Sequence, residues 1–255
     1  MQSIKSKARK LLEKIVFGGK LREKLIASYL GAIYKSQFRR EWIYADHEPH
    51  FFNHRWDVHE LMYGSTKNPY VFFRGFFAVE SLRKGDKLLD IGCGDGFFTN
   101  AFYGSSCSTI DAVDIEESAI KTAKELNNNK NINYLVLDAT SEPFPSKSYD
   151  AIIFDGAIGH FAEADMAKLI EKISNSLAKN GIFIGSESLG DHEGDDHLQY
   201  FANEEELARV FKPFFKYVFI KKVLYTLNSG TERAEAFWRC SNEDERINSL
   251  KWKQL

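Results

Sequence analysis

One short segment of the chain combines glycines and acids in a spacing that suits ligand binding. It reads Lys87-Leu88-Leu89-Asp90-Ile91-Gly92-Cys93-Gly94-Asp95-Gly96-Phe97. The apolar residues predict a strand, and the glycines predict a sharp turn into a helix. Because glycine has no Cβ, the backbone of such a turn can approach a ligand closely. In an open α/β sheet ligands bind beyond the carboxyl ends of the strands, where this turn is expected to lie.

The spacing and the charge of this turn argue against a dinucleotide. Dinucleotide folds use Gly-x-Gly-x-x-Gly, whereas Phe97 stands here at the position of the third glycine. Asp90 comes two residues before Gly92. A carboxylate at that point favours a cationic ligand over a pyrophosphate, so the turn predicts a ligand other than NAD.

From Asp90 onward the chain resembles the class I S-adenosylmethionine-dependent methyltransferases over about a hundred residues. The similarity lies in motifs that occur in the family's order: Asp90-x-Gly92-x-Gly94-x-Gly96, Ala112-Val113-Asp114-Ile115, Glu117 to Ala123, Leu137-Asp138-Ala139, Pro143-Phe144, Tyr149 to Ile153 and Leu177 to Phe183. Asn180 stands where the family more often has glycine. The resemblance implies S-adenosylmethionine as cofactor and S-adenosylhomocysteine as product.

The resemblance also implies roles for individual side chains. The first motif would meet the methionine part of the cofactor, Asp114 would accept hydrogen bonds from both ribose hydroxyls, and Asp138 would read the adenine amino group. The predicted cofactor-binding residues are Asp90, Gly92, Cys93, Gly94, Asp114, Ile115, Asp138, Ala139, Asp155 and Arg74, the last for the cofactor carboxylate. The alternative for each acid is a solvated loop carboxylate or a helix cap, and Asp95 is a cap candidate for the helix that begins at Phe97.

Side chains beyond the fourth and fifth predicted strands are candidates for chemistry on the methyl acceptor. Methyl transfer is an in-line displacement that depends on positioning, and an acceptor hydroxyl or protonated amine also needs a base. His160 follows strand four, and Glu187 and His192 follow strand five, so these three are the predicted catalytic residues. A structural role for His160, orienting its loop, is an equal alternative.

Two segments of the sequence are rich in histidine and acidic residues, which are possible metal ligands. One group is His47, His50, His54 and His59, and the other is the 187–197 loop with Asp191, His192, Asp195 and His197. The upstream group has neither the His-Glu-x-x-His pattern nor a cysteine partner. An upstream helical lid and an exposed acidic loop are the favoured interpretations, so no metal site is predicted.

The remaining pattern predicts the elements that position these residues. Strand-like runs at 87–91, 109–114, 132–137, 149–154 and 181–186 alternate with helical patterns at 97–104, 116–127 and 163–178. A helix at 203–211 has the capping-box pair Asn203 and Glu206, and runs 214–226 and 233–240 flank a turn at 228–230. Together with the resemblance, this predicts an α/β three-layer sandwich. Its mostly parallel seven-stranded sheet has the last strand antiparallel in a C-terminal β-hairpin, and a helical extension precedes it.

We expect four segments along the chain. Residues 1–40 form a basic helical arm, 41–85 a helical lid rich in aromatic residues and histidine, 86–241 the core, and 242–255 a tail. Within the arm, 4–15 and 20–38 predict amphipathic helices around Gly18-Gly19, and in the lid Pro49 and Pro69 are expected in first helical turns. Trp56 and Tyr63 are lid candidates for contact with the pocket, with packing as the alternative.

Charge is distributed unevenly along the chain. The whole sequence has 34 Lys and Arg against 36 Asp and Glu, but residues 1–40 hold eleven of the basic residues and only two of the acids. The acidic remainder argues against DNA as a partner and makes RNA a less favoured one. For the arm, a solvated helix is the favoured interpretation, contact with an anionic membrane surface the second, and RNA the third.

The composition bounds the class of protein. A chain of 255 residues that is 44% hydrophobic and 27% charged is ordinary for a globular protein, either one large domain or one domain with an appendage. Three cysteines without Cys-x-x-Cys, no bilayer-length apolar run and no signal-peptide pattern predict a cytoplasmic setting.

The predicted function is methyl transfer to an oxygen or nitrogen atom of a small polar molecule, with a sugar or other natural-product intermediate suggested by the polar, histidine-bearing loop after strand five. Two alternatives stay open: an RNA or protein methyltransferase, and a non-catalytic cofactor-binding protein on the same fold. The sequence does not predict an oligomeric state.

Overall fold

The computed structural model describes residues 6–7, 9–11, 19–44, 54–63, 69–190, 197–226, 232–243 and 246. They belong to two compact units. The first unit contains helices α2 (Gly19–Tyr44) and α3 (His54–Tyr63). None of the helices within these described ranges is both long and apolar enough to cross a membrane. The predicted division into arm, lid, core and tail stays a prediction.

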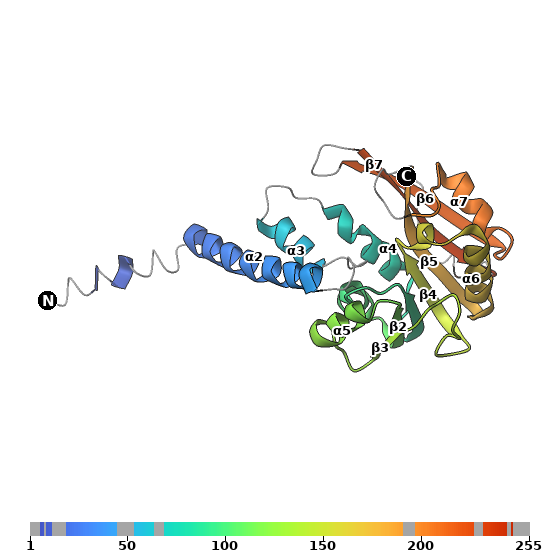
Figure 1. Ribbon diagram of the computed structural model, residues 1–255, viewed down its shortest axis with the longest axis horizontal. Helices are drawn as coiled ribbons and strands as arrows, with labels where there is room; N and C mark the ends of the chain where they lie inside the picture. Colours follow the sequence, from blue (N-terminus) through green and yellow to red (C-terminus); the bar gives the residue numbers. More distant parts are fainter. Residues whose placement is uncertain are drawn as a thin grey trace. The chain divides into compact units, whose positions relative to one another are not determined.

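The second unit alternates strands and helices along the chain, which can be followed by colour in Figure 1. Its elements are η1 (Pro69–Phe72), α4 (Phe73–Ser81), β1 (Asp86–Ile91), η2 (Thr99–Tyr103), β2 (Cys107–Asp114), α5 (Glu117–Leu126), β3 (Ile132–Val136), β4 (Tyr149–Asp155), η3 (Ile158–His160), α6 (Glu163–Asn175), β5 (Leu177–Leu189), α7 (Glu204–Phe211), β6 (Tyr217–Thr226) and β7 (Glu232–Ser241).

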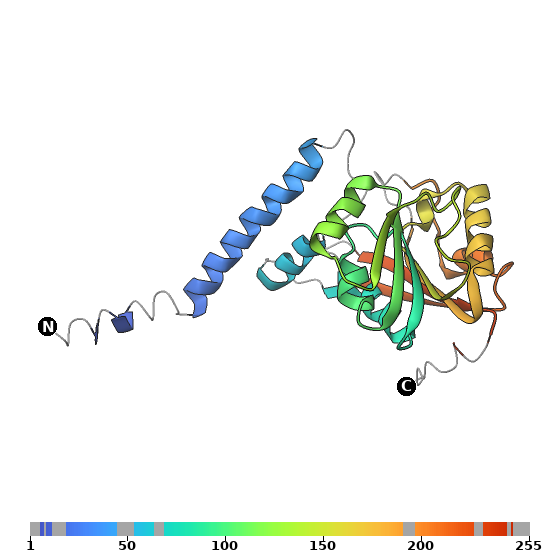
Figure 2. The ribbon, with the colours of Figure 1, turned by 90° about the horizontal axis from the view of Figure 1, so that it is seen from below.

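The strands form one seven-stranded sheet in the order β3-β2-β1-β4-β5-β7-β6. The first five strands in sequence pair in parallel, while β7 runs antiparallel to both β5 and β6. Helices α5 and α6 lie on opposite sides of the strands (Figure 2), so the predicted three-layer α/β fold is confirmed. The strand order reverses between β1 and β4, and in such sheets that reversal opens a crevice for ligands at the carboxyl ends.

Both faces of the central strands are buried, which explains their continuous apolar character. On one face Ile152 and Phe183 belong to the apolar core that includes the inner sides of α6 and α7. On the other face Ile153 and Ile184 line a small cavity together with residues of α4. Gly185 in β5 is required by packing, because a Cβ there would lie 2.2 Å from Trp238 Cζ2 and 1.9 Å from the Phe154 carbonyl oxygen.

Several element boundaries differ from the predicted ones for local reasons. Strand β6 begins at Tyr217, not at 214, because the N–H groups of Phe214 and Phe215 donate to the Phe211 carbonyl and close the end of α7. Strand β5 begins at Leu177, which pairs with Tyr149 before a shift in register. Residues 99–103, predicted as α-helix, form a π-helix, and α2 continues to position 44.

The predicted cap of α7 is present. The Asn203 side chain accepts a hydrogen bond from the Glu206 N–H at 3.0 Å, and the Glu206 carboxylate accepts one from the Ala202 N–H at 2.8 Å. Pro69 begins η1, as its fixed φ predicts. Pro49, the helix residues 12–15 and the hairpin turn at 228–230 lie outside the described residues.

Candidate functional site

The glycine-rich turn follows β1 directly and has the backbone that only glycine adopts without strain. Gly92, Gly94 and Gly96 have φ values of +70°, +53° and +72°. The N–H groups of Gly92 and Cys93 both donate to the Val113 carbonyl, at 2.8 and 3.1 Å, and the Gly96 N–H donates to the Cys93 carbonyl at 3.0 Å. These N–H groups are used within the protein. The turn is therefore unlike a phosphate cradle, in which N–H groups point at the ligand.

Asp114 ends β2 beside this turn. Its Oδ2 accepts from the Gly94 N–H at 2.8 Å and its Oδ1 accepts from the Glu116 N–H at 2.9 Å. Burial raises the pKa of Asp114, and the two N–H groups oppose that rise. Each carboxylate oxygen can accept a further hydrogen bond. Asp114 is thus fixed in orientation and keeps acceptor capacity for two neighbouring hydroxyl groups.

Asp90 lies at the carboxyl end of β1 and is 4% exposed. Thr99 donates its hydroxyl to Asp90 Oδ2 at 2.6 Å. Burial raises the pKa of Asp90 to about 7, against the lowering effect of the Thr99 hydrogen bond, and the charges of Asp155 and Asp114 add to the rise. Three acids therefore gather around the turn, and a cationic ligand there would stabilise their ionised forms.

Two buried polar residues outside the turn hold it in place. Asn127 donates its side-chain amide to the Asp95 carbonyl at 2.7 Å, and the Tyr134 hydroxyl lies 3.3 Å from the Gly96 carbonyl and 3.0 Å from the Asn127 carbonyl. A Cβ on Gly96 would lie 2.6 Å from the Tyr134 hydroxyl. Asp95 Oδ1 accepts from the Phe97 N–H at 3.0 Å, which is the predicted cap. Sequence reasoning missed Asn127 and Tyr134.

Asp138 lies in the turn that follows β3. Its Oδ1 accepts from the N–H and the hydroxyl of Thr140, at 2.8 and 2.6 Å, and its Oδ2 accepts from the Ser141 hydroxyl at 2.8 Å. These hydrogen bonds hold the pKa of Asp138 below its usual value. Asp138 therefore closes its own turn, next to the buried Ala139, and its contact with adenine stays a prediction. Ile115 is exposed after β2.

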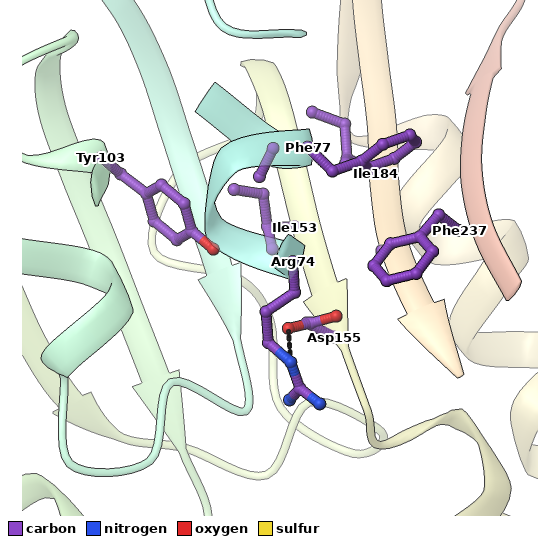
Figure 3. Close-up of a pocket in the computed structure, with 9 residues that line it drawn as sticks. Arg74, Phe77, Tyr103, Ile153, Asp155, Ile184 and Phe237 are labelled. Atoms are coloured by element: carbon purple, nitrogen blue, oxygen red, sulfur yellow. Dashed lines mark ion pairs between the residues drawn. The ribbon is translucent and has the colours of Figure 1, made fainter. Parts of the chain in front are cut away.

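Arg74 extends from α4 to the carboxyl end of β4, where Figure 3 shows it against Asp155. Its Nε lies 3.4 Å from Asp155 Oδ2, and a terminal nitrogen lies 3.5 Å from Glu235 Oε1. Burial disfavours the guanidinium charge, but the two carboxylates outweigh it and the pKa of Arg74 is raised. The other guanidinium nitrogen lies close to Gly156, where a Cβ would be 3.3 Å away. Arg74 is thus placed at the rim of the crevice but already pairs with two acids.

Polar side chains of β5, β6 and β7 form a network around Asp155 and Glu235, the two acids that pair with Arg74. The Ser186 hydroxyl contacts Asp155 Oδ1 and lies 2.7 Å from Glu235 Oε1, while the Tyr225 hydroxyl donates to Glu235 Oε2 at 3.0 Å. The Tyr225 ring stacks on Tyr70 with centroids 5.0 Å apart. Sequence reasoning missed Ser186, Tyr225 and Glu235. For Glu235 the sequence did contain a signal, because it is the only acid in the otherwise apolar run 234–238.

Glu187 lies near the carboxyl end of β5, and His160 ends η3, the short helix that follows β4. Glu187 is 2% exposed, and its two oxygens accept the N–H groups of Gly159 at 3.1 Å and Ser188 at 2.8 Å. Burial raises the pKa of Glu187, while these N–H groups and the nearby His160 oppose the rise. The exposed His160 ring meets the His197 ring edge to face, with centroids 4.4 Å apart. The structure therefore brings Glu187, His160 and His197 into one loop cluster.

Other predicted residues have separate surroundings or are not described. In the first unit, His59 Nε2 lies 2.9 Å from the Ala27 carbonyl, and its ring is 5.4 Å from Tyr63. His47, His50, His192 and the Trp56 side chain lie outside the described residues. Within the part of the chain that is described, no three His, Cys, Asp or Glu side chains lie close enough to hold one metal ion.

The three cysteines, all within the described ranges, are free thiols. Burial raises the pKa of each, well above the usual value for Cys93 and Cys240 and to about 12 for Cys107. A thiol is nucleophilic as the thiolate, which burial disfavours at all three positions.

Residues 89–185 match the family described as a methyltransferase domain. Among curated proteins, the eEF1A lysine and N-terminal methyltransferase of Xenopus laevis is 24% identical over 140 residues, 51% of this chain and 20% of that protein. The ribosomal protein L11 methyltransferase of Thermotoga neapolitana is 26% identical over 124 residues, 49% of this chain and 45% of that protein. The chain thus spans less than half the length of these relatives.

Solved structures share the fold at low identity. The N-methyltransferase NodS of Bradyrhizobium japonicum WM9, in complex with S-adenosyl-L-homocysteine, has a TM-score of 0.55 and 18% identity, covering 70% of this chain and 91% of that one. A Haloferax volcanii methyltransferase in complex with its Trm112 activator has a TM-score of 0.56 and 15% identity, covering 68% and 90%. The strand order and the acids around the glycine turn thus occur in a fold that methyltransferases use.

Proposed function

We propose that this protein, whose residues 89–185 match the methyltransferase domain family, is a class I S-adenosylmethionine-dependent methyltransferase. It would transfer a methyl group to an oxygen or nitrogen atom of a small polar molecule. The position of Asp114 is the observation that supports S-adenosylmethionine as the cofactor. Its carboxylate is held by the Gly94 and Glu116 N–H groups beside a glycine turn whose own N–H groups are already used. That arrangement favours a ligand with a pair of hydroxyls and a positive charge.

The residues present fit this cofactor. Bound S-adenosylmethionine supplies a methyl group on a positively charged sulfur. Asp114 would hold the ribose hydroxyls, and the 92–96 turn with Asp90 would lie against the methionine part. Cys93 would contribute only its backbone there. Ile115, Asp138 and Ala139 would surround the adenine, and Arg74 with Asp155 would flank the carboxylate and amino ends.

On the acceptor side, the loop cluster divides into a positioning residue and a candidate base. Glu187 is buried and accepts two backbone N–H groups, so it would hold the 157–160 loop in place. His160 is exposed at the end of that loop and would take the acceptor's proton, a role for which imidazole suits neutral pH. His192 remains a further catalytic prediction.

A sugar or another natural-product intermediate is the proposed acceptor class, because polar side chains border the carboxyl ends of β4 and β5. A protein acceptor is the second candidate, since two relatives are named for methylation of eEF1A and ribosomal protein L11. RNA is the third candidate acceptor, because the residues after position 40 have a net negative charge. A cytoplasmic setting stays part of the proposal.

The cofactor proposal is tested by thermal shift. S-adenosylhomocysteine is expected to raise the melting temperature of the full chain in a concentration-dependent way, and NAD is expected to leave it unchanged. Stabilisation by NAD alone would overturn the assignment.

The acceptor is tested with a methyl-labelled donor and lysate separated into small-molecule, protein and RNA fractions, followed by mass analysis of the labelled species. We expect label among the small molecules. Label only in a protein band would establish the second candidate. Cofactor binding with label in none of the fractions would support the non-catalytic alternative.

A further inference from the structure

A lysine of α6 lies close to the turn that carries Asp138. Lys172 belongs to the last turn of α6, and that helix begins shortly after the carboxyl end of β4. Helical side chains point toward the N-terminus of their helix. The Lys172 side chain is therefore directed back toward the carboxyl edge of the sheet, where β3 ends and the Asp138 turn begins.

Three groups of residues 139–144 surround the Lys172 ammonium. Its Nζ donates to the Ala139 carbonyl at 2.8 Å and also donates to the Glu142 carbonyl. The same nitrogen lies 4.0 Å from the centroid of the Phe144 ring, and that side chain is buried. An ammonium donates to carbonyl oxygens and is attracted to the face of an aromatic ring. Lys172 thus fastens this segment to α6.

The contacts of Lys172 complement those of the Asp138 carboxylate, which accepts the Thr140 N–H at 2.8 Å. The ends of the turn are joined as well, because the Glu142 N–H donates to the Asp138 carbonyl at 3.0 Å and the Asp138 N–H donates to the Glu142 carboxylate at 2.9 Å. Asp138 therefore binds donors of the turn, whereas Lys172 binds the carbonyls of Ala139 and Glu142.

The surroundings of Lys172 differ from those of an ordinary surface lysine, which keeps its strongly hydrated ammonium in water. Burial lowers the pKa of Lys172, and the charges of Asp138 and Glu142 oppose that lowering. Lys168, one helical turn earlier, has a side chain that is 75% exposed and lies 3.3 Å from Asp165. Lys172 gives up part of its hydration for its contacts with the 139–144 segment, which indicates a specific role there.

We propose that Lys172 is a positioning residue for adenine recognition. It holds the Asp138 turn in the shape in which the Asp138 carboxylate accepts a hydrogen bond from the adenine amino group. A purine without that amino group cannot donate this hydrogen bond, so the site binds it less tightly. Lys172 does not touch the ligand and acts through the Ala139 and Glu142 carbonyls. This inference rests on the proposed function, because adenine enters the site as part of the cofactor.

The experiment compares two ligands by isothermal titration calorimetry on the full chain. One is S-adenosylhomocysteine, and the other is its analogue with an unsubstituted purine, which lacks the amino group. The unmodified protein should prefer S-adenosylhomocysteine roughly tenfold or more, the usual effect of one hydrogen bond to a charged acceptor. Lys172→Met keeps the apolar stem but removes the ammonium, and it should reduce this preference to about twofold. Lys172→Arg keeps a cation with N–H donors and should retain part of the preference.

Lys168→Met is the matched control, because it removes an exposed ammonium from the same helix, and it should keep the full preference. Hydrogen exchange at the Thr140 and Glu142 amides, measured by NMR without ligand, follows the turn directly. We expect this exchange to accelerate roughly tenfold in Lys172→Met and to stay unchanged in Lys168→Met. The melting temperature of each variant checks that it is folded.

Three results would overturn the proposal. One is an unmodified protein that binds both ligands equally well. The second is a preference that Lys172→Met retains, even if both affinities fall, because the lysine would then support the fold and not adenine recognition. The third is an equal loss of preference in Lys172→Met and Lys168→Met. Failure of the proposed function would look different, because the unmodified chain would bind neither ligand. The adenine role would fall with it, while ligand-free exchange would still show whether Lys172 holds the turn.

Discussion

The carboxylate of Glu187 accepts the N–H of Gly159 at 3.1 Å, which ties the carboxyl end of β5 to the loop that carries His160. The two residues are 28 positions apart, and the parallel pairing of β4 with β5 brings them together. Glu187 also accepts the Ser188 N–H, so both of its oxygens hold backbone N–H groups beside the His160 imidazole. His160 is therefore presented by a fixed loop.

The variant Glu187→Gln tests this positioning role. An amide nitrogen cannot accept an N–H, so one of the two backbone hydrogen bonds is lost and a buried donor is left unsatisfied. We expect hydrogen exchange at the Gly159 amide to accelerate roughly tenfold or more, together with slower methyl transfer and nearly unchanged affinity for S-adenosylhomocysteine. Exchange is measured by NMR. Glu205→Gln, an exposed acid of α7, is the control, and unchanged Gly159 exchange in the buried variant would contradict the role.

The variant Asp114→Ala tests the ribose contact. It removes the only carboxylate that the structure places between the Gly94 and Glu116 N–H groups. Two hydrogen bonds from hydroxyls to a charged acceptor would be lost, so the affinity for S-adenosylhomocysteine should fall by about 100-fold. Isothermal titration calorimetry measures it. Asp165→Asn on α6, whose partner is the exposed Lys168 at 3.3 Å, should bind like the unmodified protein, and equal affinity in both variants would rule Asp114 out.

The buried Asp90 should make stability depend on pH. Burial raises its pKa from 3.8 to about 7 in the folded protein. Between these values the folded state keeps a proton that the unfolded chain releases. The Asp90 contribution to the free energy of unfolding is therefore fully present below about pH 4 and is lost as the pH rises through about 7. Asp90→Asn is neutral throughout and should gain on the order of 2–4 kcal/mol relative to the unmodified protein between about pH 4 and about pH 8.

Urea unfolding of both proteins at several pH values measures this difference. Subtracting the two curves removes the contributions of Asp114 and Glu187, whose pKa values are also raised. A difference that stays constant with pH would mean that Asp90 is ionised in the fold. Added S-adenosylmethionine, being cationic at sulfur, should shift the transition of the unmodified protein to lower pH.

Substitutions of Arg74 and Glu235, which are far apart in sequence, should have non-additive effects on the free energy of unfolding. Arg74→Met leaves Asp155 and Glu235 without their shared cation, and the cost should be on the order of 3 kcal/mol in free energy of unfolding. Adding Glu235→Gln should recover part of that loss, because one of the two unpaired charges is removed. A double-mutant cycle from urea unfolding measures the coupling. Lys168→Met, which breaks an exposed pair, should cost less than about 1 kcal/mol, and additive effects at Arg74 and Glu235 would contradict the network.

The parts of the site that could be predicted from sequence are those whose position follows from the period of a single strand and its turn. Asp114 was predicted at the end of the second strand, and it lies there beside the glycine turn after β1 because adjacent parallel strands present their carboxyl ends together. Asp95 was a candidate cap, and it accepts the Phe97 N–H. Glycines at 92, 94 and 96 were predicted to allow a tight approach, and all three have positive φ.

Predictions from the resemblance alone were less informative about what a side chain does. Arg74 was expected to meet a cofactor carboxylate, yet its surroundings include two acids from β4 and β7. Asp138 was expected to meet adenine, and it also caps its own turn. These contacts depend on neighbours that no single motif specifies.

By itself, the sequence determined the alternation of strands and helices, the glycine turn and the acids at the ends of the first two strands, because local periodicity and backbone freedom specify them. Only the tertiary structure decided that Glu235 and Tyr225 join Arg74 and Asp155, and that His197 meets His160. The first grouping depends on the antiparallel insertion of β7 between β5 and β6, and the second on the loop after β5 folding back onto Gly159. Such pairings are selected by the burial of the whole sheet. The free energy of that burial is spread over many residues, so no single residue or motif predicts it.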